Sequence, residues 1–202
     1  MNKNELAKFV GYWQKMGMME QRMGYLYGYY SEDPNYPNGV RVNIEALYEP
    51  PQINDMNGFV ELEDPNLYKV DQIASALGLE KVGHIFTKID QDTFLNSHEI
   101  RRAATFQQQH IFDHPDGFKV SKFVTVVVQP KGDDVGVECY MVSDQCQALE
   151  RDGVFGNTDN RKLLKVREPG PDDMVPTILT QGKGVKEIEP EFFIVSLAHG
   201  QP

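Results

Sequence analysis

The sequence predicts an α/β protein in which a mixed β-sheet packs against helices. Helical and strand-like segments alternate along the chain, and one strand-like segment, FVTVVV at residues 123–128, is continuously apolar. The hydrophobic content is 40%, which is typical of a globular protein. At 202 residues the chain can form one full domain, with or without a small additional module.

The first elements are predicted to be a helix and a β-hairpin. Apolar residues recur with a helical period at Leu6, Phe9 and Trp13, and Gly17 suits the helix end. The segments RMGYLYGYY and GVRVNIEALYE are rich in Tyr and Val, as strands are. Between them, SEDPNYPNG has the composition of a turn, so the two strands are predicted to pair.

A second helix is predicted from Asp64, with Asp64 as N-cap, Pro65 as the first helical residue and Gly78 at the end. Its apolar face would contain Leu67, Val70, Ile73 and Leu77. KVGHIFT is then a short buried strand, and a third helix starts at Asn96. After FVTVVV, the segment VGVECYMVS is a further strand, and SDQCQALERDG is a helix that ends at Gly153. The central strands of the sheet are expected to include residues 23–29, 40–49, 81–86 and 123–128. Five of their residues should be largely buried: Leu26, Ile44, Ile85, Val124 and Val126.

The composition changes after about residue 155, where the chain becomes polar and rich in Pro and Gly. We therefore expect one domain over residues 1–155, and the start of a β-rich module, apparently truncated, over residues 156–202. That module contains two strand-like pieces, MVPTILT and EFFIVSLA.

Charge and cysteine content exclude several classes of function. The net charge of −10 argues against nucleic acid or an anionic membrane surface as partner. No apolar run is long enough to span a bilayer, and the N-terminus lacks the apolar core of a signal peptide. With only Cys139 and Cys146, the chain lacks a disulfide framework or a four-cysteine zinc site, and a reducing compartment is expected.

The order of elements, together with GYLYG, EPPQ, GLEKVGHIF and FVTVVVQP, resembles an MPN domain, the fold of the zinc-dependent JAMM isopeptidases that remove ubiquitin. Active members of that family have a glutamate before the first strand. They also have a His-x-His-Pro strand end, a following Ser-x-x-Asp and an apolar strand that ends in Asp-Pro. The histidines and the aspartate bind zinc, and the glutamate activates a water molecule.

This sequence departs from that pattern at every functional position. Gln21 replaces the glutamate, and Phe86 and Lys88 replace the two histidines. Asn96 and Glu99 replace the serine and the aspartate. Phenylalanine has no lone pair for zinc, a protonated lysine repels the cation, and glutamine cannot act as a general base. The resemblance therefore implies a catalytically degenerate fold with no catalytic residue, no metal and no cofactor.

The remaining polar residues near this pattern have simpler interpretations. Glu20, His84 and His98 are out of register with the ligand positions. Asn96 and Glu99 fit a capping box at a helix start, which we favour over a functional role. The set His110, Asp113 and His114 could ligate a metal from one helix face, but Pro115 and Gly117 favour a solvated turn there.

A narrower resemblance rests on six segments in order: MEQRMGYLYGYY, IEALYEPPQ, LEDPN, LGLEKVGHIFT, FVTVVV and VSDQCQALERDGVF. Together they resemble the nuclear protein localization protein 4 family, and EFFIVSLAHGQP resembles the start of that family's C-terminal domain. The resemblance implies a non-catalytic adaptor of the ubiquitin–proteasome pathway in cytoplasm and nucleus, including the ER surface. Its implied partners are polyubiquitin, the ubiquitin-fusion-degradation protein and the valosin-containing AAA+ ATPase. The family's ATPase-docking elements precede this region and are absent from the sequence.

Two other classes stay open: an MPN assembly scaffold of the proteasome-lid or translation-initiation type, and an active zinc isopeptidase with rearranged ligands. For the adaptor, we expect a binding surface around residues 155–200 that includes Phe193 and Val195. EFFIVSLA could hold a partner strand at a free sheet edge, or it could pack on the core; the sequence leaves both open.

Overall fold

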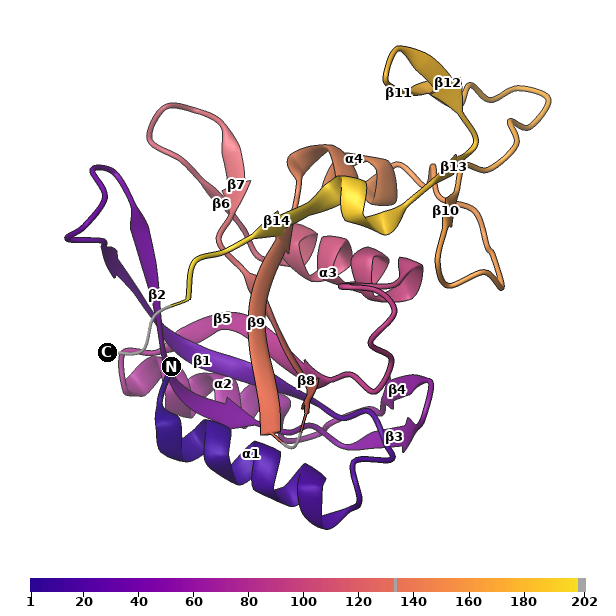
Figure 1. Ribbon diagram of the computed structural model, residues 1–202. Coiled ribbons are helices and arrows are strands. Elements are labelled where there is room, and N and C mark those ends of the chain that lie inside the picture. Colours follow the sequence, from indigo (N-terminus) through magenta and orange to yellow (C-terminus); the bar gives the residue numbers. More distant parts are fainter. Residues whose placement is uncertain (133, 200–202) are drawn as a thin grey trace. The chain divides into compact units, whose positions relative to one another are not determined.

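The computed structural model describes residues 1–132 and 134–199 (Figure 1). Contacts between residues divide the chain into two compact units. Unit 1 contains residues 1–91 and 123–139 with the end of the chain from Ala198, and unit 2 contains residues 92–122 and 140–197. The last residues of the predicted C-terminal module, 200–202, lie outside the described part of the chain, as does Asp133 in the predicted KGDD turn.

Unit 1 is built on a mixed sheet. Strand β1 (Met23–Glu32) is antiparallel to both β2 (Val40–Tyr48) and β5 (Glu80–Thr87), and β5 is parallel to β8 (Val124–Lys131). Strand β9 (Asp134–Val142) follows β8 in the sheet order. A separate hairpin is formed by β3 (Gln52–Asp55) and β4 (Gly58–Glu61). The predicted α/β class and mixed sheet are confirmed.

Two glycines allow the strands of this sheet to approach closely. The register between β1 and β2 shifts at Gly28, where a Cβ atom would lie 1.8 Å from the Asn43 carbonyl oxygen. At Gly83 a Cβ atom would lie 2.5 Å from the Val124 carbonyl oxygen of the parallel neighbour. Any side chain at either position would push the strands apart, because backbone atoms cannot move aside as a flexible side chain can.

Helices α1 (Lys3–Lys15) and α2 (Leu67–Ala76) complete unit 1. Trp13 of α1 is fully buried, and its indole N–H donates to the Glu20 carbonyl oxygen over 2.8 Å. This bond fixes the turn that leads from α1 into β1, and Gly17 in that turn has a φ of 75°. The side chain of Trp13 thus buries its apolar ring while its one polar group is satisfied.

The core of unit 1 lies where the sequence predicts it. The five residues predicted to be buried all have exposed fractions of 7% or less. They are Leu26, Ile44, Ile85, Val124 and Val126. The prediction that residues 40–49 form a central strand is wrong, because β2 ends the order β9–β8–β5–β1–β2.

The predicted start of α2 is wrong by two residues. Asn66, not Asp64, is the N-cap, and the helix begins at Leu67. The Asp64 carboxylate accepts hydrogen bonds from the Asn66 N–H and the Tyr48 hydroxyl, both over 2.8 Å, so it closes a turn instead of a helix. The predicted apolar face is not the buried face either, since Ile73 and Leu77 are exposed and Ala74 is buried.

Unit 2 contains the helices α3 (Ser97–Gln109) and α4 (Asp144–Arg151), and three antiparallel pairs of short strands. These strands are β6 (Ile111–Asp113) with β7 (Lys119–Ser121), β10 (Leu164–Lys165) with β13 (Glu187–Ile188), and β11 (Ile178–Thr180) with β12 (Lys183–Val185). The predicted strand EFFIVSLA is only partly a strand. A 3₁₀ turn, η1 (Pro190–Phe193), forms its first half, and β14 (Ile194–Ser196) pairs with Tyr140–Val142 of β9.

One buried glutamine holds α3 to the end of β9. Gln107 is fully buried, and its amide donates to the Val142 carbonyl oxygen over 3.0 Å and accepts from the Val142 N–H over 2.8 Å. The side chain therefore reproduces the two bonds that a neighbouring strand would make. Ser143 then caps α4, its hydroxyl accepting from the Cys146 N–H.

The start of α3 generates a stability prediction. Asn96 and Glu99 form the predicted capping box: Asn96 Oδ1 accepts from the His98 and Glu99 N–H groups, and Glu99 accepts from the Asn96 N–H. Asn96→Ala should lower the free energy of unfolding by about 1–2 kcal/mol, because buried N–H groups would lose their acceptor. Chemical denaturation measures this loss.

Asn66→Ala is the matched control for that measurement. Asn66 is also an N-cap asparagine, but its side chain makes no capping hydrogen bond. We expect a change within about 0.5 kcal/mol. Equal losses in the two variants would contradict the role assigned to the Asn96 side chain.

Candidate functional site

Phe86 lies in β5, the most deeply buried strand of unit 1. Every residue of that strand from Val82 to Thr87 is buried. The Phe86 ring is 1% exposed and lies beside the Phe59 ring, with 6.2 Å between centroids, and the His84 ring, at 5.8 Å. Phe86, which the resemblance to JAMM isopeptidases predicts to replace a zinc-binding histidine, is therefore an apolar ring of the core.

Lys88 follows directly after β5, and its side chain is completely buried. Its backbone N–H donates to the Val128 carbonyl oxygen over 2.7 Å, which extends the pairing of β5 with β8. Its ammonium group lies 3.6 Å from the Asp90 carboxylate. A buried lysine needs such a counter-charge, since an isolated ammonium is costly to remove from water.

Gln21 precedes β1 and is 3% exposed. Its N–H donates to the Asp55 carbonyl oxygen over 2.8 Å. The adjacent Arg22 carbonyl oxygen accepts from the Thr87 N–H, also over 2.8 Å, so the chain at Gln21 runs beside the end of β5. Unit 1 thus brings three of the sequence-predicted positions, Gln21, Phe86 and Lys88, to one end of its sheet.

Asn96 and Glu99 belong to unit 2, where both are buried in the capping box of α3. The hydrogen-bonding capacity of the two side chains is directed at the helix N-terminus. Their role in the structure is the one that the spacing Asn-x-x-Glu predicts.

The residues at these positions do not fit zinc. Phe86 offers no donor atom, and Lys88 supplies a cation. Across residues 1–132 and 134–199, no three His, Cys, Asp or Glu side chains come together in a way that could hold a metal ion. His84 is buried between the Phe86 and Phe123 rings, and His98 is exposed on α3.

The alternative metal set is also separated by local structure. His110 ends α3, and Asp113 ends the short strand β6. His114 lies in the following turn, where its ring stacks on Phe118 with 4.3 Å between centroids. The helix ends before these residues, as Pro115 and Gly117 predict, so the spacing of four residues no longer places both histidines on one helix face.

The two residues predicted to bind a partner have different environments within unit 2. Phe193 is completely buried, with its ring 5.8 Å from that of Phe155, and its carbonyl oxygen accepts from the Ser143 N–H. Val195 is 44% exposed on β14. Only Val195 is therefore accessible to a partner, and whether it binds one stays a prediction.

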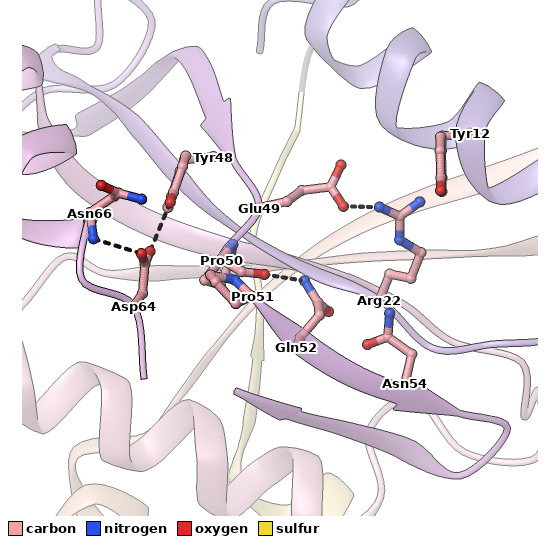
Figure 2. A pocket seen from close by; sticks show the side chains of 10 residues that line it. All are labelled: Tyr12, Arg22, Tyr48, Glu49, Pro50, Pro51, Gln52, Asn54, Asp64 and Asn66. Carbon is pink, nitrogen blue, oxygen red and sulfur yellow. Dashed lines mark hydrogen bonds and ion pairs between the residues drawn. The ribbon is translucent and has the colours of Figure 1, made fainter. Parts of the chain in front are cut away.

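Unit 1 also contains a shallow groove of about 570 Å³ that the sequence analysis missed (Figure 2). Its lining residues are Tyr12, Arg22, Tyr48, Glu49, Pro50, Pro51, Gln52, Asn54, Asp64 and Asn66. The Arg22 guanidinium lies 3.9 Å from the centre of the Tyr12 ring and pairs with the Glu49 carboxylate. Burial raises the pKa of Glu49, and the charge of Arg22 opposes that shift. In the sequence, the segment EPPQ at residues 49–52 could have indicated this groove. It places two prolines between an acid and an amide at the end of a strand.

The structure is that of an α/β protein in which Phe86 is part of the core and Asn96 and Glu99 cap a helix. The chain belongs to the NPL4 family, whose profile matches residues 22–202. It is 40% identical over 191 residues to the nuclear protein localization protein 4 homologs of Homo sapiens and Rattus norvegicus. The alignment covers 85% of this chain and 31% of each relative.

The similarity extends to yeast. Nuclear protein localization protein 4 of Saccharomyces cerevisiae is 29% identical over 229 residues, which cover 98% of this chain and 39% of that protein. The chain thus spans between about a third and two fifths of the length of these curated relatives. In the described residues, no helix is long and apolar enough to cross a membrane.

The packing of Phe86 generates a second stability prediction. Phe86→Ala should lower the free energy of unfolding by about 3–5 kcal/mol, because it leaves a cavity next to Phe59 and His84. The control is Phe94→Ala, which truncates a ring that is 56% exposed and should cost about 1 kcal/mol or less. Denaturant unfolding compares the two, and a similar loss in both would mean that Phe86 does not support the core.

Proposed function

We propose that this chain is a catalytically inactive MPN-like region that acts as an adaptor in the ubiquitin–proteasome pathway. The main support for this proposal is that the residues aligned with the zinc site of active isopeptidases have structural roles here. Phe86 and Lys88 are buried in unit 1, and Asn96 and Glu99 cap α3 in unit 2. Membership of the NPL4 family and the mixed sheet support the same assignment.

In this proposal residues 1–155 form the MPN-like domain, and residues from 156 begin a second module. The chain binds ubiquitin or polyubiquitinated substrate and the ubiquitin-fusion-degradation partner, and it cleaves neither. Within the whole protein, it presents substrate to the valosin-containing AAA+ unfoldase. It functions in the cytoplasm and nucleus, including the ER surface.

The proposed binding surface in unit 2 centres on β14. This strand pairs with β9 through Ile194, Val195 and Ser196, and no second neighbour pairs with it in the described residues. A strand with one free edge can accept an extended segment by backbone hydrogen bonds, while exposed side chains such as Val195 contact alternate side chains of that segment. The burial of Phe193 supports this role indirectly, because the ring anchors the residue before β14.

The test compares capture of polyubiquitin, and separately of the ubiquitin-fusion-degradation partner's peptide, by the intact chain and by Val195→Glu. We expect the variant to lose about tenfold or more in affinity for at least one of them, because a carboxylate would be desolvated at the contact. Val40→Glu is the control, since Val40 is 56% exposed on another edge strand, β2. Phe193 is unsuitable for this test, because a charged residue there would disrupt the core.

Three outcomes contradict the proposal. Unchanged capture of both ligands by Val195→Glu would remove β14 as the binding surface. Hydrolysis of diubiquitin that stops on addition of a chelator would contradict the adaptor assignment itself and favour a zinc isopeptidase with rearranged ligands. A stable heterodimer with another MPN protein, with no ubiquitin capture, would favour the assembly scaffold.

A further inference from the structure

The loop between β1 and β2 ends in a tight turn that contains an asparagine followed by a glycine, Asn38–Gly39. The Gly39 N–H donates to the Tyr36 carbonyl oxygen over 2.9 Å, which closes the turn. Pro37 in second place and Asn38 in third place, with a φ of 62°, are the residues that a type II turn favours. Asn38 is exposed, and in the described part of the chain no hydrogen bond holds its side chain.

An asparagine that precedes a glycine can react with its own main chain. The glycine nitrogen, after losing its proton, attacks the asparagine Cγ; the bond from Cγ to the side-chain nitrogen breaks, and ammonia leaves. One water molecule then opens the resulting succinimide ring at either carbonyl, which gives aspartate or isoaspartate. A Cβ atom on the second residue hinders the attack, and glycine has none. The fold itself requires glycine at position 39, because a Cβ there would lie 2.9 Å from the Tyr36 carbonyl oxygen.

The sequence contains one other such pair, Asn57–Gly58 in the turn of the hairpin β3–β4, which serves as an internal comparison. Asn57 is exposed as well. There the Asp55 carboxylate accepts from the Asn57 N–H over 2.6 Å and from the Gly58 N–H over 2.8 Å. A carboxylate at this distance disfavours loss of the Gly58 proton, because a second negative charge would form beside the first. The turn therefore protects Asn57.

The corresponding nitrogen of Gly39 has no carboxylate bound to its proton, since its acceptor is the neutral Tyr36 carbonyl group. Asp33 also belongs to this loop, but its Oδ1 accepts from the Asn35 N–H over 2.8 Å and lies 3.4 Å from the Arg41 guanidinium. The charge of Asp33 is thus opposed by a cation. Two turns with the same pair of residues therefore differ in the charge beside the attacking nitrogen.

We propose that Asn38 is a site of spontaneous deamidation, and that Asn57 is protected from the same reaction by Asp55. The product carries one additional negative charge. In its isoaspartyl form the main chain gains one atom directly before β2, where pairing with β1 begins at Glu32 and Val40. The isoaspartyl carboxylate makes this turn a substrate for an enzyme that methylates isoaspartate. This inference is independent of the proposed function, because β14 belongs to unit 2 and this turn to unit 1.

The experiment incubates the intact chain in mildly alkaline buffer and samples it over time. Peptides from each sample are separated and identified by mass spectrometry, which distinguishes asparagine, aspartate and isoaspartate at each position. We expect asparagine at position 38 to be lost about tenfold or more faster than at position 57. Loss at position 38 should quicken as the pH rises, because the attacking nitrogen must lose its proton. Transfer of a labelled methyl group by an isoaspartate methyltransferase gives a second readout.

Variants separate the two turns. Asn38→Gly keeps a residue that tolerates the positive φ and should abolish most of the methyl transfer, whereas Asn57→Ser, the matched control, should leave it unchanged. Asp55→Ser removes the charge but keeps a short oxygen acceptor beside Gly58. It should raise the rate of loss at Asn57 about tenfold and leave the rate at Asn38 unchanged.

Three results would overturn the proposal. The first is loss at Asn57 as fast as at Asn38 in the folded chain. The second is retention of Asn38 over a period in which a synthetic peptide of residues 33–43 loses it completely, which would show that the folded turn suppresses the reaction. The third is an unchanged rate at Asn57 in Asp55→Ser, which would remove the protection assigned to Asp55. Failure of Val195→Glu to affect ubiquitin capture would leave this proposal standing.

Discussion

The burial of β5 from Val82 to Thr87 is the constraint on which unit 1 depends. The strand lies between β1 and β8, so its backbone is paired on both edges, and every side chain from Val82 to Thr87 is inaccessible to water. In such a strand any polar group must find a partner inside the protein. A zinc ion would satisfy imidazole or carboxylate side chains there. In this protein the end of the strand carries Phe86, whose ring packs against Phe59. The next residue but one, Lys88, forms an ion pair with Asp90.

The sequence predicts best those parts of the fold that depend on residues close together in the chain. The spacing of Asn96 and Glu99 specifies a capping box, and the continuous apolar segment at residues 123–128 specifies a strand buried on both faces. The replacements at Gln21, Phe86 and Lys88 could also be interpreted from residue chemistry alone, because a missing lone pair does not depend on tertiary structure.

The parts that the sequence analysis missed depend on competition between neighbouring groups. Asp64 is a good N-cap residue, but the Tyr48 hydroxyl and a turn N–H engage its carboxylate, and the helix starts later. The strands β3 and β4 have four residues each, too few for a period of two to be recognised, although Asn57–Gly58 is a hairpin signal. The groove needs Tyr12 of α1, Arg22 just before β1 and residues between Tyr48 and Asn66, which only the folded chain brings together.

An aromatic contact links the end of β5 to the hairpin β3–β4. The Phe86 ring packs beside Phe59 on the inner face of the hairpin. A histidine committed to a metal would present a polar ring to Phe59, whereas phenylalanine extends the apolar core to the base of the hairpin. Phenylalanine at position 86 therefore gives β3–β4 an apolar support. The inner face of the hairpin is thus anchored to unit 1, and Ile53 and Val60 lie exposed on its outer face.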